Sequence, residues 1–166
     1  MINDRRAKII ARLEAVLSGL AITLSSGSIP AGNYVHNLGE LPANKVPGVI
    51  LLDGDEVAGL PLSAAPGRQT PPRDKMMKMT PEIYVVLDVR KGAKQNENVG
   101  EDLNIARVAV LAAVLGDAGL QSLCGANGEI CYDGCVTDLA RNRTLKGQIG
   151  MSITCVYPFL PGELVE

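Results

Sequence analysis

Residues 149–157 read Ile-Gly-Met-Ser-Ile-Thr-Cys-Val-Tyr, a stretch in which larger apolar side chains alternate with small or polar ones. Successive side chains of a β-strand point to opposite faces, so this alternation is typical of a strand with one buried face. With its flanking residues, the pattern predicts a strand over 148–159. A second alternation of the same kind predicts a strand over 82–89.

Shorter apolar runs predict further strands. Runs bounded by turn-forming residues place these strands at 34–38, 49–52, 75–79 and 129–139. Pro81 lies just before the strand at 82–89, and proline cannot donate a ladder hydrogen bond, so we expect an edge position or a bulge there. Residues 25–32 and 40–45 show no regular period and are predicted to be a loop and a turn. A basic hinge at 141–147 is expected to join the last two strands.

Two segments carry the spacing of a helix. Asn3 or Asp4 can cap the first, over 3–18, and Gly19 is placed to end it. Its predicted buried face consists of Ile9, Ile10, Leu13, Val16, Leu17 and Leu20. The second helix covers 101–115. Its many alanines indicate close packing on more than one side.

Together these elements predict the α+β class, with a mostly antiparallel sheet of four to five strands flanked by two helices. The predicted order is α-β-β-β-α-β-β, in a single domain over 1–166. Residues 53–74 interrupt the pattern with four prolines and three glycines. An irregular segment of this length is uncommon inside a compact domain and is typical of a functional or disordered loop.

The composition limits the classes of function. Sixteen Lys and Arg against eighteen Asp and Glu give a formal net charge of −2. A protein that binds duplex DNA with its whole surface is usually basic, so general nucleic-acid binding is disfavoured, while a local basic patch remains open. The N-terminus does not resemble a signal peptide, and the longest apolar run, 108–115, is too short to cross a bilayer. We therefore expect a cytoplasmic protein that does not enter a membrane.

The four cysteines, at positions 124, 131, 135 and 155, allow three interpretations. An even number suggests disulfides in a secreted chain, but without a secretion signal free thiols are the default. A structural zinc site usually shows two close ligand pairs, whereas here Cys131 and Cys135 are separated by three residues and the one histidine is far away in the sequence. Buried free thiols are favoured.

Candidate catalytic groups are few. His36 lies in a strand-like stretch without a Ser or Cys in a nucleophile context, so an exposed strand histidine is favoured over a catalytic one. Asp53, Asp55 and Glu56 suggest a cation site, but the other ligands of a calcium loop are absent, which favours an acidic turn. No glycine pattern indicates a phosphate-binding loop. The sequence therefore predicts no catalytic, cofactor-binding or metal-binding residue, and no enzyme.

Several features taken together resemble the tail terminator (tail completion) proteins of long-tailed bacteriophages. They are the N-terminal helix, the long loop after an early strand, the segment Met-Thr-Pro-Glu-Ile-Tyr-Val-Val-Leu at 79–87, the alanine-rich helix with Arg107, and the closing strand at 149–157. The resemblance is one of layout over most of the chain and rests on no invariant motif, so no functional residue is transferred position by position.

The resemblance implies a virion structural protein, without cofactor or catalytic residue, that forms a homohexameric ring at the head-proximal end of the tail. Such a ring caps the tail tube, so its partners are the tail tube protein and the neck or connector protein of the head. Assembly takes place in the host cytoplasm. Another head–tail connector or neck protein is the nearest alternative, and a small-molecule-binding α/β domain is a more distant one.

Two groups of residues are candidates for roles in such a ring. The cations of the last turn, Arg141, Arg143 and Lys146, either keep a solvated hairpin soluble or face the central channel. In the second case, the symmetry of the ring repeats these cations around the channel, where they contact DNA without reading its sequence. The loop at 53–74 is expected to order on assembly, which makes its charged residues candidate assembly contacts: Asp55, Glu56, Arg68, Arg73 and Asp74.

Overall fold

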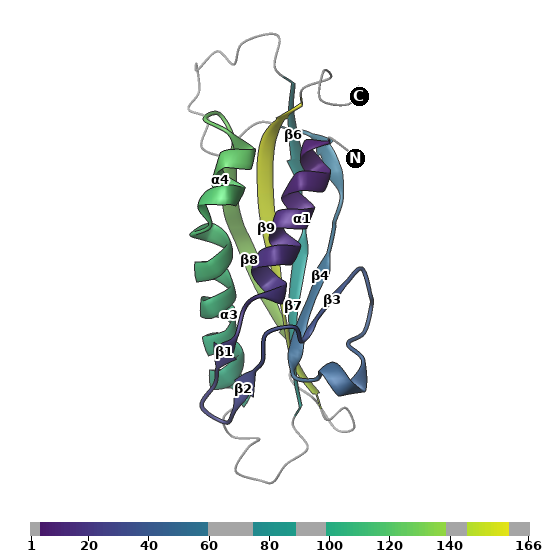
Figure 1. Ribbon diagram of the computed structural model, residues 1–166, viewed down its shortest axis with the longest axis vertical. Coiled ribbons are helices and arrows are strands. Elements are labelled where there is room, and N and C mark those ends of the chain that lie inside the picture. Colours follow the sequence, from purple (N-terminus) through teal and green to yellow (C-terminus); the bar gives the residue numbers. More distant parts are fainter. Residues whose placement is uncertain (1–3, 60–74, 89–98, 139–145, 160–166) are drawn as a thin grey trace.

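The computed structural model describes residues 4–59, 75–88, 99–138 and 146–159 (Figure 1). The helices are α1 (Arg5–Ser18), α3 (Val99–Leu115), α4 (Ala118–Cys124) and the short 3-10 helix η1 (Ala43–Lys45). The strands are β1 (Ile22–Thr23), β2 (Ser28–Ile29), β3 (Tyr34–His36), β4 (Gly48–Leu52), β5 (Glu56–Ala58), β6 (Lys75–Met79), β7 (Glu82–Asp88), β8 (Glu129–Asp138) and β9 (Lys146–Phe159).

The long strand β9 organises the main sheet. It pairs antiparallel with both β6 and β7 in one continuous register, in which Met79 lies opposite Cys155 and Glu82 lies opposite Ser152. Strands β6 and β7 therefore lie end to end along one side of β9. Pro81 separates them, but its carbonyl still accepts a hydrogen bond from the Ile153 amide (3.1 Å).

The other strands extend the sheet on both sides. On one side, β4 pairs with β7 and β5 pairs with β6, both antiparallel, and β3 pairs parallel with β4. On the other side, β8 pairs antiparallel with β9. The seven strands thus occupy five adjacent positions across the sheet, which we call lanes. Their order is β3, then β4 with β5, then β7 with β6, then β9 and β8.

Strands β4 and β5 share a lane because the chain bulges between them. Three residues, Asp53 to Asp55, lie opposite the two residues Thr80 and Pro81, which leaves one extra residue on the β4–β5 side. Gly54 has a φ of 68°, and a Cβ at this position would lie 1.8 Å from the Thr80 carbonyl oxygen. The bulge therefore requires glycine both for its backbone conformation and for the space.

The helices cover one face of the sheet, and the main core lies between these two layers (Figure 1). Helix α1 contributes Ile9, Ile10, Leu13 and Leu17 to this core, as its helical spacing predicts. From β9 the alternating residues Ile149, Met151, Ile153, Cys155 and Tyr157 enter the same core. The predicted strand over 148–159 and its core-facing residues are confirmed, but the strand begins at Lys146, and Thr154 and Val156 on the opposite face are buried as well.

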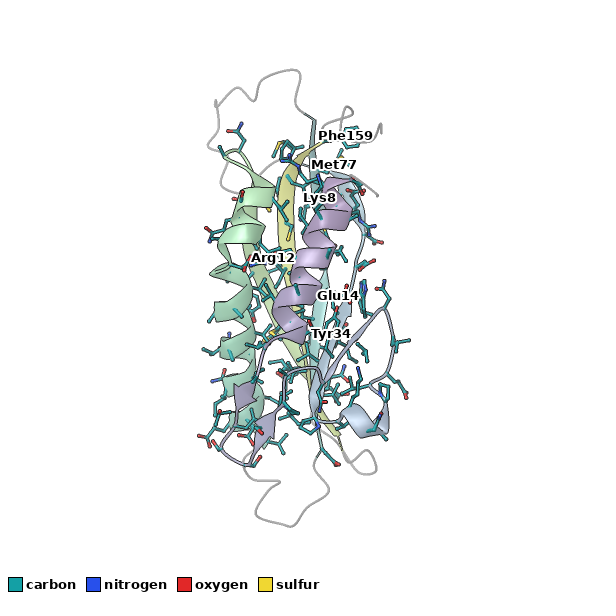
Figure 2. The ribbon with its side chains drawn as sticks, in the orientation of Figure 1. Lys8, Arg12, Glu14, Tyr34, Met77 and Phe159 are labelled. Atoms are coloured by element: carbon teal, nitrogen blue, oxygen red, sulfur yellow. The ribbon has the colours of Figure 1, made fainter. Side chains whose placement is uncertain are left out.

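Polar side chains fix the ends of two helices. The Asp4 carboxylate accepts hydrogen bonds from the Arg6 and Ala7 amides and caps α1. Asp117 caps α4 through the Leu120 amide (2.7 Å) and also binds the Arg12 guanidinium at 3.0 and 2.7 Å. Hydrogen bonding to Arg12 lowers the pKa of Asp117. One carboxylate therefore both begins α4 and holds it against α1, on which Arg12 lies (Figure 2).

The α+β class is confirmed, but the detailed arrangement differs from the prediction. The structure has three helices rather than two, because Gly116 and Asp117 end α3 and begin α4. The sheet is mixed and has seven strands rather than four to five. Pro81 lies in the interior of the sheet and does not mark an edge, but the predicted alternative, a bulge, is found opposite Thr80 and Pro81.

Three segments predicted to be irregular contain strands. Ser28–Ile29 in the predicted loop at 25–32 pairs with Ile22–Thr23 as a two-stranded sheet. Glu56–Ala58 in the predicted loop at 53–74 forms β5. Strand β9 begins within the predicted hinge at 141–147. Each pairs with a neighbour that no local pattern in the sequence reveals.

Tyr34 supplies a test of the packing between α1 and β3. Its ring is buried, and its hydroxyl has no hydrogen-bond partner among the described residues (Figure 2). Burial raises the pKa of Tyr34, because a charged phenolate would lose its hydration. A buried hydroxyl without a partner costs stability, so we expect Tyr34→Phe to raise the free energy of unfolding by about 1 kcal/mol in urea denaturation.

Tyr157 is the matched control, since its buried hydroxyl donates to the Glu56 carboxylate. We expect Tyr157→Phe to lower the free energy of unfolding by about 1 kcal/mol, because it removes a satisfied bond. If both substitutions destabilise the protein to the same extent, the hydroxyl of Tyr34 is bonded in solution and the expectation is wrong.

Candidate functional site

The outer face of α3 is apolar over its last two turns. Val108, Leu111, Ala112 and Leu115 follow one another at helical spacing, and we call these four residues the α3 stripe. Val108 is 52% exposed, Ala112 is exposed, and both leucines are half-buried, Leu111 partly against the main core. The opposite face of the helix supplies Ala106, Val110 and Val114 to the core. A helix that is apolar on all sides is usually covered on all sides.

A second exposed surface lies at the edge of the sheet formed by β8. Within the described residues this strand pairs with β9 alone, so its outer backbone groups have no strand partner there. The last four residues, from Cys135 to Asp138, are all exposed, and Val136 is 77% exposed. A bulge between Tyr132 and Gly134 twists the first half of the strand. The second half lacks the proline or lysine that often protects an edge.

A cavity of about 330 Å³ lies beside this edge, on the sheet face opposite the helices. Its lining residues are Glu82, Tyr84, Asp133, Gly134, Cys135, Val136, Gly150, Met151 and Ser152. The Tyr84 ring lies over Gly150, where a Cβ would come within 2.6 Å of it. Gly134 lies opposite Ser152, so three small residues form the floor.

Two carboxylates of this cavity are held by hydroxyl groups. The Tyr84 hydroxyl donates to Glu82 (2.5 Å), and the Thr154 hydroxyl donates to Asp133 (2.6 Å). The bond to Glu82 raises the pKa of Tyr84, so the phenol stays neutral. Each hydroxyl engages one oxygen of its carboxylate, and further acceptor sites remain on both groups.

His36 lies at the end of β3 and is engaged with Asp53. Its Nε2 atom lies 2.5 Å from the carboxylate of Asp53, and the Asn37 amide donates to the second oxygen (3.0 Å). Burial opposes the charge on Asp53, but the bonds from Asn37 and His36 and the charge of Arg6 lower its pKa below the ordinary value. This carboxylate therefore binds an amide and an imidazole and lies near the charge of Arg6, an arrangement that fastens β3 to the end of β4 and that contains no nucleophile.

The cysteines are free thiols in different environments. Cys124 and Cys155 are buried and interact with each other, which raises the pKa of Cys155. Cys131 is half-buried and Cys135 is exposed, so the prediction of buried thiols holds for two of the four. Across the described ranges, no three side chains of His, Cys, Asp or Glu converge as ligands of a metal ion.

In the part of the chain that the structure describes, no single helix is long and apolar enough to cross a membrane. Helices α3 and α4 together reach the required length and composition but are bent by 55° at their junction. Both helices contribute residues to the main core.

The residues predicted for ring assembly are only partly described. Arg68, Arg73, Asp74, Arg141 and Arg143 lie outside the described residues. Glu56 belongs to β5 and accepts the hydrogen bond of Tyr157, so it supports the sheet. The Asp55 carbonyl accepts from the Thr80 amide (3.0 Å). Lys146 was predicted in the turn but begins β9, opposite Asp88.

The sequence interpretation missed both the α3 stripe and the cavity. The alanine-rich composition of 101–115 indicated packing on several sides, but the buried side could be identified only in three dimensions. The cavity joins side chains of β7, β8 and β9, and its floor depends on a register that the sequence does not show. No protein-family model matches the sequence, and no curated protein is significantly similar to it.

Proposed function

We propose that this chain is a structural subunit that assembles into a closed ring, as expected of a tail terminator. The observation that carries the proposal is the α3 stripe. An apolar outer surface on a long helix gains stability when another surface covers it. A surface that contacts a different surface of the next copy produces a ring when the rotation closes.

The described side chains support an assembly role over catalysis. His36 and Asp53 form the closest approach to a catalytic pair, and their contacts fasten one strand to another. The other alternative is the cavity at Tyr84, whose carboxylates are already held by hydroxyl groups. Neither arrangement presents an activated nucleophile.

The charge of two segments in the sequence is consistent with a ring. Asp88 ends β7 opposite Lys146, which begins β9, and β8 ends nearby with Asp138 opposite Gln148. The last residues of β7 and β8 and the first residue of β9 therefore lie at one end of the sheet, and the segments 89–98 and 139–145 follow β7 and β8 in the sequence. Their sequences contain five Lys or Arg and one Glu, which is a net charge of +4 per copy. In a ring, this charge would gather around one rim, where it attracts phosphate without reading sequence.

The mass and symmetry of the purified protein test the proposal. We expect native mass spectrometry and light scattering to show a species of six copies, either free or after addition of tail tubes, and electron microscopy to show it as a ring. We expect the rings to be found on tail tubes that have stopped growing. A chain that remains monomeric both alone and with tubes would contradict the proposal. A ring found on the neck side alone would favour the connector alternative.

A further inference from the structure

We propose that the free edge of β8 and the adjacent cavity bind an extended basic segment of a partner protein. The site comprises the edge residues from Asp133 to Asp138 and the cavity floored by Gly134, Gly150 and Ser152. The segment adds to the sheet as a further strand, and one of its Arg or Lys side chains enters the cavity. This inference does not depend on the formation of a ring.

The backbone of β8 supplies the first part of the recognition. An edge strand presents a row of amide and carbonyl groups that an extended peptide can pair with, as in other cases of strand addition. Its second half is exposed and pairs with β9 alone within the described ranges. Val136 offers an apolar neighbour to the incoming strand.

The cavity supplies the second part, because it can accept one long side chain. A residue paired opposite Gly134 would project onto the helix-free face, next to a position that has no side chain of its own. From there a flexible side chain crosses Gly134 and Ser152 toward the Tyr84 ring. A ring face beside a cation contributes further attraction.

The acidic residues of the cavity determine that the bound side chain is basic. The cavity lining includes Glu82 and Asp133 and no Lys, Arg or His. Asp138 adds a third acid at the end of the edge. A guanidinium or ammonium group fits such a surface, because it donates to carboxylates and accepts nothing.

The same charge argues against a second copy of this chain at the edge. Two β8 edges paired with each other would bring Asp133 and Asp138 of one copy beside those of the next. The far side of the sheet is also acidic where β4 meets β5, with Asp53, Asp55 and Glu56. Like charges placed opposite one another destabilise paired strands. A basic partner would not be repelled by the acidic residues of the β8 edge.

A synthetic peptide tests the proposal on the full chain. The probe is an acetylated, amidated octapeptide of alternating Thr and Arg that carries a fluorophore, and binding is followed by anisotropy. We expect it to bind at least tenfold more tightly than the matched Thr–Glu peptide, and to bind more weakly as salt rises. Backbone N-methylation in one of the two alternating frames should abolish binding, and methylation in the other frame should not. Amide NMR should place the contact on β8 and β9.

Matched variants separate the site from general charge attraction. Glu82→Gln with Asp133→Asn keeps the bonds from Tyr84 and Thr154 but removes two charges, and we expect at least a tenfold loss of affinity. Glu14→Gln with Glu101→Gln removes two exposed charges elsewhere and should change affinity less than twofold. Equal losses in both pairs, tolerance of N-methylation in both frames, or β8 amides protected by self-association of the chain would each overturn the proposal.

Discussion

Replacing Ala112 by Glu is expected to convert the proposed ring into single subunits while the subunit stays folded. Ala112 is exposed in the middle of the α3 stripe, so the substitution introduces no clash within the subunit. At a covered interface, however, the new carboxylate would lose water without gaining a partner, which costs several kcal/mol at each contact. A ring has one such contact for every copy. Native mass spectrometry should therefore show loss of the oligomer altogether.

The control is the same substitution on another helix. Ala11 on α1 is also exposed, and Ala11→Glu adds the same charge near Lys8 without touching the α3 stripe. We expect both variants to unfold within about 0.5 kcal/mol of the parent, because neither side chain is packed. If Ala112→Glu still forms rings, α3 is not the contact surface. If both variants lose the oligomer, the effect is one of net charge.

The same variant distinguishes the two proposals made here. The α3 stripe and the β8 edge are different surfaces, so Ala112→Glu should retain binding of the Thr–Arg peptide. The Glu82→Gln, Asp133→Asn pair should retain the ring. Loss of both properties in either variant would indicate that one surface serves both contacts.

The elements that carried strong local patterns could be predicted from the sequence. In α1 and β9, helical spacing and alternation identified the residues that face the main core, but not the burial of Thr154 and Val156 on the other face of β9. Strand β4 was also placed correctly, because Gly48 and Asp53 bound a short apolar run. In such segments one side of the pattern is apolar, and burial follows from local sequence alone.

Other features depend on contacts between distant segments. The two residues of β2 become a strand because Ile22 pairs with Ile29, and the three residues of β5 do so because β6 lies beside them. Helix α4 did have a local signal in the sequence. Asp117 follows Gly116, and Asp is a preferred residue at the N-terminal cap of a helix. The α3 stripe lacked any such signal, because every side of the last two turns of the helix is apolar and only the fold decides which side faces out.

Glycine substitutions test whether the bulge between β4 and β5 fixes the register of the sheet. We expect Gly54→Ala to cost about 3–5 kcal/mol, the largest effect among the exposed glycines. The added Cβ would lie 1.8 Å from the carbonyl oxygen and 2.5 Å from the carbonyl carbon of Thr80. Relief requires a shift of the backbone that separates β6 from β7, two strands that share one register along β9.

Substitutions at two other glycines separate the conformational strain of Gly54→Ala from its steric clash. Gly32 has a φ of 85° but open space around its Cβ position, so Gly32→Ala carries the conformational strain alone, about 1 kcal/mol. Gly39 has open space and no positive φ, so Gly39→Ala should leave stability unchanged or raise it slightly by restricting the unfolded chain. Urea denaturation of the three variants should rank them with Gly54→Ala far below Gly32→Ala. If Gly54→Ala costs no more than Gly32→Ala, the two backbones do not approach each other closely, and β4 and β5 do not share a lane.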